Sequence, residues 1–205
     1  MGRGRIEAFS DGVFAVAITV LALNLAVAGP GHGSLARQLT DHWPSFVAFA
    51  ISFFTIGIIW VNHHALFATL KAIDRPLVFW NLLLLFFVVS IPFATATMAS
   101  YLRGGGPDAG LAMAVYEAVF AGMSLAFGVV FFYALSRHLL PVSDDPAERR
   151  TVTVRFLIGN AAYLIAIGVA FVSAGAALAI SGLVAVYYIF ERTPTPAEAE
   201  ELGPG

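Results

Sequence analysis

Cysteine is absent from the 205 residues, and charged residues make up only 12% of them. A chain without cysteine has no disulfide, no thiolate nucleophile and no cysteine metal ligand. The formal net charge is -2, and the sequence has no basic stripe of the kind that binds nucleic acid. These shortages exclude several classes of site and leave a chain dominated by apolar side chains.

Hydrophobic residues account for 59% of the chain, and its mean hydropathy is +0.84. A soluble domain of this length needs more polar surface than the sequence provides. The composition therefore predicts an integral membrane protein whose first partner is the lipid bilayer.

Six stretches are long and apolar enough to be membrane helices, since a spanning helix needs about 20 mostly apolar residues. They are Ile6–Val27, Phe46–Leu70, Leu77–Tyr101, Gly110–Leu135, Val152–Val172 and Ala174–Phe190. We therefore predict an all-α bundle of six transmembrane helices in a single domain over residues 1–192. The polar, proline-rich segment 193–205 is expected to be a disordered tail.

The basic residues predict the orientation, because Lys and Arg concentrate on the cytoplasmic side. In the six-span arrangement only Arg37 and Arg103 fall on one side, and nine basic residues fall on the other. We expect both termini in the cytoplasm, at the cell inner (plasma) membrane. A cleavable signal peptide is a weaker alternative, because Glu7 and Asp11 interrupt the first apolar run.

Ionisable side chains inside a span are functional candidates by default. Glu117 is expected to be a protonated acid or a hydrogen-bonded structural residue. Asp11 and Arg5 are separated by about 120° around a helix, too far for a direct pair, so each needs another partner. Polar side chains at the depth of Asp11 are Trp60, Asn62, His63, His64 and Asn81.

Three interpretations of this polar group remain open: a structural clamp between the first three helices, a proton relay and a metal site. We favour the clamp, since satisfied polar groups commonly join membrane helices. A metal site is disfavoured, because the adjacent His63 and His64 point about 100° apart on a helix. No catalytic cluster is apparent, and the chain is not expected to be an enzyme.

The first predicted helix also has an apolar stripe formed by Val16, Val20 and Leu23, which follow i, i+4, i+7 spacing. Thr19 borders this stripe at about 60° from Val16. A helix that turns Asp11 into the bundle therefore presents a different, apolar face elsewhere.

The segment "RIEAFSDGVFAVAITVLAL" places Arg5, Phe9, Ser10 and Asp11 in the order Arg, three residues, Phe-Ser-Asp. It resembles the signature of the transmembrane protein 175 family of potassium-permeable channels. The segments "WVNHHALF" and "NLLLLFFVVSIPFATA" also resemble that family's second and third helices. The resemblance covers the first three predicted spans well, and the last three by topology.

The resemblance implies a homotetramer in which four first helices line a pore for monovalent cations, K+ above all. It implies a constriction at Val16, Val20 and Leu23, with the Thr19 hydroxyl nearby and no TVGYG filter, a segment this sequence lacks. Rings of apolar side chains can gate a pore by dewetting. Beyond the permeant ion, no cofactor is implied. The clamp that orients the pore helix would then comprise Arg5, Phe9, Ser10, Asp11, Trp60, His63, His64 and Asn81.

A proton-coupled secondary transporter is the alternative, with Asp11 and His63 or His64 as proton carriers. It would require polar residues gathered at mid-membrane. The polar residues Asn24, Ser90 and Asn160 are too scattered along the sequence to predict such a group.

Overall fold

The computed structural model describes residues 2–25, 27–140 and 146–190, and in these residues the chain forms seven α-helices. Residues 193–205, predicted to be a disordered tail, lie outside the described part. The helices are α1 (Arg3–Ala22), α2 (Leu35–Asp41), α3 (Trp43–Thr69), α4 (Arg75–Leu102), α5 (Gly106–Ser136), α6 (Pro146–Ala170) and α7 (Ala174–Phe190). The all-α prediction is confirmed.

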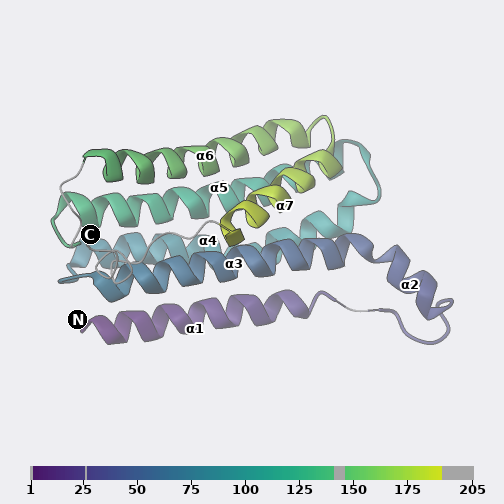
Figure 1. Cartoon of the computed structure of the whole chain (residues 1–205). Helices are drawn as coiled ribbons and strands as arrows, with labels where there is room; N and C mark the ends of the chain where they lie inside the picture. Colours follow the sequence, from purple (N-terminus) through teal and green to yellow (C-terminus); the bar gives the residue numbers. More distant parts are fainter. Residues whose placement is uncertain (1, 26, 141–145, 191–205) are drawn as a thin grey trace.

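Five long helices, α1, α3, α4, α5 and α6, run side by side, whereas α7 crosses them obliquely and α2 lies at one end (Figure 1). The helices α4 and α5 pack closely together at the centre of the bundle. On one side α1 packs against α3 and α4, and on the other α6 packs against α5 and α7. The first helix is thus peripheral and touches the bundle with one face.

Three helices, α3, α4 and α5, are long and apolar enough to cross a membrane, so half of the predicted spans are supported by length and composition. The apolar parts of the last two helices, Phe156–Ala170 and Ala174–Ile189, are shorter. The first helix carries Arg3, Arg5, Glu7 and Asp11 near its start, which lowers its hydropathy. The chain is a multi-pass membrane protein, and the count of six spans stays a prediction.

The first helix ends earlier than predicted, at Ala22 rather than Val27. Leu23 is its C-cap, and the amides of Leu23, Asn24 and Leu25 bond to carbonyls three residues back, which tightens the last turn. The short helix α2 was not predicted, because a polar helix of 7 residues has no spanning signal.

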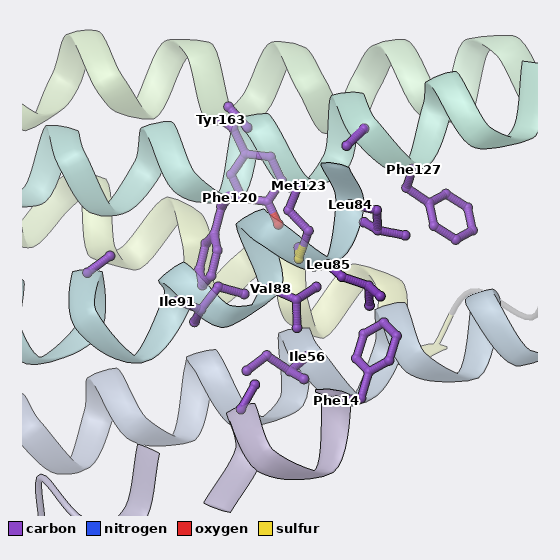
Figure 2. Close-up of a cluster of buried hydrophobic side chains, with 14 of the residues drawn as sticks. Phe14, Ile56, Leu84, Leu85, Val88, Ile91, Phe120, Met123, Phe127 and Tyr163 are labelled. Atoms are coloured by element: carbon purple, nitrogen blue, oxygen red, sulfur yellow. The ribbon is translucent and has the colours of Figure 1, made fainter. Parts of the chain in front are cut away.

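The core joins the helices through large apolar side chains. Figure 2 shows Phe14 of α1 and Ile56 of α3 at the bottom of the cluster, Val88 of α4 and Met123 of α5 above them, and Tyr163 of α6 at the top. The first four of these side chains are at most 1% exposed. Because this core reaches α1 at Phe14, it fixes the rotation of α1 and so decides which face of that helix is left open.

Candidate functional site

The first helix has one buried face. Ile6, Ser10, Phe14, Ala17 and Leu21 are buried, at spacings of three and four residues, against α3 and α4. This spacing is that of a helix stripe. The buried face includes Ser10, so one polar group of the predicted clamp enters the core.

The opposite face of α1 is uncovered in the single chain. Val16 is 59% exposed, Val20 37% and Leu23 78%. Thr19 is also exposed and borders them around the helix, at about 60° from Val16. The apolar stripe predicted from the sequence is therefore on the side of α1 that the chain's own helices leave free.

The Thr19 hydroxyl donates to the backbone oxygen of Val16 at 2.9 Å. Such local bonds are common for threonine in helices. The hydroxyl proton is thereby used within the helix, and the oxygen keeps its lone pairs. The exposed Thr19 therefore presents its hydroxyl oxygen as an acceptor, and such an oxygen can coordinate a cation.

A buried hydrogen-bonded chain links α1, α4 and α3 through Ser10, Asn81 and His63, each at most 1% exposed. Asn81 Nδ2 donates to Ser10 Oγ at 3.0 Å, and His63 Nε2 lies 2.8 Å from Asn81 Oδ1. Since the amide nitrogen is used on Ser10, the amide oxygen faces His63, and Nε2 carries the ring proton.

Aromatic contacts hold the His63 ring in place. The ring stacks on Phe67 with centroids 4.1 Å apart, and Phe14 of α1 lies at 5.4 Å. His63 is thus packed on its faces and hydrogen-bonded at its edge. These contacts fix both the depth and the rotation of α1 relative to α3.

Asp11 belongs to a separate, more exposed contact. The Trp60 indole donates to Asp11 Oδ1 at 2.9 Å, and the His64 ring lies 6.1 Å from the Trp60 ring. In the described part of the chain, neither histidine bonds to Asp11. The polar residues grouped by the sequence therefore divide between a buried chain and a surface pair.

The guanidinium at the start of α1 that binds the bundle is Arg3, not Arg5. Arg3 Nη1 donates to the Ala68 oxygen at 2.9 Å and to the Leu70 oxygen at 3.3 Å, and Arg3 lies 3.6 Å from Glu7. Arg5 is exposed, and the described residues give its side chain no partner. Sequence reasoning missed Arg3, although its i, i+4 spacing to Glu7 is a usable signal.

Three further members of the proposed group, Phe9, Trp60 and His64, are also exposed, and Phe9 is 55% exposed. Within the described residues, no three His, Cys, Asp or Glu side chains gather into a metal site. The geometry therefore consists of a helix held by polar contacts on one face and open on the other.

Comparison with known proteins gives consistent matches. A family model described as "Endosomal/lysosomal potassium channel TMEM175" matches residues 5–92. A potassium channel of Streptomyces collinus is 46% identical over 197 residues, covering 94% of each chain. A potassium channel of Chamaesiphon minutus is 37% identical and covers 90% of this chain and 92% of its own.

A crystal structure shows the same similarity in three dimensions. It is described as a lysosomal potassium-selective channel TMEM175 homolog from Chamaesiphon minutus, is 36% identical and superposes with a TM-score of 0.78. The match covers 91% of this chain and 96% of that one. The shared fold thus extends well beyond the segment matched by the family model.

Proposed function

Because the chain belongs to the TMEM175 family of potassium channels, we propose that it forms a potassium-permeable channel as a homotetramer, with α1 lining the pore. The observation that carries the proposal is the open apolar face of α1, opposite the face held by Ser10 and Phe14. The family is one of channels and not of enzymes.

The open face has the composition of a constriction. Val16, Val20 and Leu23 lie within an arc of about 60° on this face, and they span about 10 Å along the helix. Four copies around an axis would form three apolar rings. A cation that enters such a segment loses water, so the rings impose a barrier that depends on wetting.

Thr19 supplies the polar part of the same face. Its oxygen keeps free lone pairs, because its proton is donated to Val16. Four such oxygens would replace part of the water lost by the ion. A few hydroxyl oxygens make a weaker coordination shell than rings of backbone carbonyls, so the preference for potassium over sodium should be moderate.

The polar contacts of α1 hold this helix in place against α3 and α4. Ser10, Asn81 and His63 anchor the buried face, and Trp60 holds Asp11 at the side of the helix. His63 is a poor proton carrier for the alternative transporter, since its ring is enclosed between Phe67 and Asn81.

The test is a reversal-potential measurement in planar bilayers under potassium and sodium gradients. Leu23→Asn or Val20→Ser should raise conductance several-fold and lower the preference for potassium, because each adds four polar groups to one ring. Thr19→Val removes four hydroxyls with little change of shape and should lower the preference without affecting assembly.

The matched controls are Ala15→Ser and Ala22→Ser, exposed α1 positions that lie about 100° and about 120° from Val16. The off-stripe positions Ala17 and Leu21 cannot serve as controls, because they are only 2% and 1% exposed. If the controls change permeation and the stripe variants do not, α1 does not line the pore.

Cross-linking of the reconstituted protein should give four copies, and a monomer would contradict the assembly.

A further inference from the structure

Glu117 of α5 is a carboxylic acid that the proposed pore does not use. Its exposed fraction is 0%, and Ser181 of α7, itself 1% exposed, donates to its Oε1. The other oxygen, Oε2, is buried and has no hydrogen-bond partner among the described residues. One carboxyl oxygen thus joins two helices while the second is left alone in the core.

A carboxylate in this position would be charged, dry and uncompensated. The titratable neighbours of Glu117 are two phenols, Tyr116 on α5 and Tyr163 on α6. Both are at most 4% exposed. Tyr116 is engaged with Ser52, and the described residues place no cation within hydrogen-bond reach of Glu117. Arg155 is eight residues before Tyr163, about 12 Å along α6. Burying a charge without a partner is very costly, so the group takes the neutral form.

The helix that Glu117 contacts is short. α7 has 17 residues, about 26 Å, slightly less than the hydrocarbon thickness, and it runs obliquely over the bundle (Figure 1). The buried residues of α7 are Ala177, Leu178, Ser181 and Ala185, and three of these four side chains are small. The Ser181 contact is therefore the polar part of an inward face that has one large apolar side chain.

Apolar grooves flank α7 on both sides. One lies toward α6, between Ala162 and Leu183, and the other toward α3, between Phe54 and Gly182. The grooves are open at the bundle surface, so no other described helix of the chain blocks a sideways shift of α7 there. The Glu117–Ser181 contact lies between the grooves, where it opposes such a shift.

We propose that Glu117 is a proton-binding site, and that the neutral acid bonded to Ser181 is a latch that holds α7 against α5. On release, the proton passes from Glu117 Oε2 to a base in the solvent and leaves a carboxylate. The new charge has no partner in its site, so it draws water between the helices and α7 moves outward. The inference is independent of the channel proposal, because neither of its measurements depends on ion flux.

Infrared spectroscopy of the reconstituted protein tests the proton. At neutral pH the wild type should show the carbonyl band of a buried carboxylic acid, and Glu117→Gln should lose it. The matched control Asp108→Asn removes an exposed acid from the same helix and should keep the band. Ser181→Ala should shift the band, since the carbonyl loses its donor. Identical spectra for wild type and Glu117→Gln, or no shift in Ser181→Ala, overturn the site.

Spin-label distances test the latch, and the absence of cysteine makes the labelling specific. Labels at Leu183→Cys on α7 and Leu125→Cys on α5 use side chains that are 69% and 54% exposed. Raising the pH until the acid band disappears should lengthen and broaden the distance. The same labels in Glu117→Gln should show no pH dependence. A distance that stays constant while the band is lost, or that changes equally in Glu117→Gln, overturns the latch.

Discussion

Asn81 has a central position among single residues, because its amide serves two partners at once. It donates to Ser10 on α1 and accepts from His63 on α3. An amide suits this place, since one end donates and the other accepts. The three side chains satisfy one another in a region where water cannot do so, and α1 is thereby tied to both neighbouring helices.

Asn81→Leu should therefore destabilise the fold strongly. The Ser10 hydroxyl and the His63 ring nitrogen would both be left buried and unpaired, at a cost of about 1–3 kcal/mol each. Thermal unfolding in detergent should show a lower melting temperature for Asn81→Leu than for the wild type. The assembled protein should be lost at the same lower temperature. Asn62→Leu is the control, because Asn62 also carries an amide but has no hydrogen bond among the described contacts. Equal melting temperatures for the two variants would contradict the clamp.

The sequence predicts which polar residues lie near Asn81 better than it predicts which of them are hydrogen-bonded to one another. Asp11, Trp60, His63 and Asn81 lie at a common depth because hydropathy sets the depth of each span. Which donor reaches which acceptor depends on helix rotation, and packing around Phe14 sets that rotation. For this reason Asp11 bonds to Trp60 while His63 bonds to Asn81, a division that spacing along one helix cannot reveal.

At the level of elements, Asp74 joins two helices at the end of the bundle where α4 begins. Its Oδ1 accepts from the Leu77 amide at 3.0 Å and caps α4, and its Oδ2 accepts from the Tyr133 hydroxyl of α5 at 2.6 Å. The Tyr133 bond favours the charged form, so it lowers the pKa of Asp74 below the ordinary 3.8. The same carboxylate thus starts one helix and fastens another.

This geometry predicts an acid-dependent stability. Because the pKa of Asp74 is lower in the folded than in the unfolded state, its stabilisation is present above the ordinary value of 3.8 and disappears as the pH falls through the folded value. Asp74→Asn keeps a capping oxygen but removes the charge. It should lower the melting temperature at neutral pH and flatten its decline toward about pH 3. Asp108→Asn should leave that slope unchanged, and an unchanged slope in Asp74→Asn would refute the role.

Helix positions follow from hydropathy more reliably than helix ends. The stretches predicted for α3, α4 and α5 overlap the observed helices almost completely, because long apolar runs must be helical in a bilayer. The C-terminus of α5 has no such signal. The chain turns there at His138, which has a φ of 54°, where glycine is the usual residue. The first helix likewise stops at Ala22 although the apolar run continues.

At the scale of the whole molecule, the two proposed functional features lie on opposite sides of the bundle. The helix α1 packs on α3 and α4 and turns its open face away from them, whereas the Glu117–Ser181 contact joins α5 to α7 (Figure 1). In the part of the chain that the structure describes, α1 is not among the main packing partners of α5 or α7. Variants of one feature therefore need not disturb the other, which makes the two proposals separable by mutation.

The bundle also has two chemically different ends. Arg3 binds the Leu70 oxygen, and the Lys71 amide donates to the Leu139 oxygen, so the start of α1 and two basic loops share one end. At the other end Arg103 binds Asp41, with Arg37 beside it. Within the described residues, Arg3 and Lys71 from the predicted basic excess lie at the end that holds the start of α1. We expect this end to face the cytoplasm with both termini.

Single cysteines test this orientation on a background without cysteine. Ala36→Cys in α2 and Ala72→Cys between α3 and α4 are both exposed and lie at opposite ends of the bundle. A membrane-impermeant maleimide applied to intact cells should label Ala36→Cys and spare Ala72→Cys, and lysis should make both react equally. The reverse pattern would place the basic end outside. Labelling of both in intact cells would mean that the loops are not separated by the bilayer, and the predicted six-span topology would fail with them.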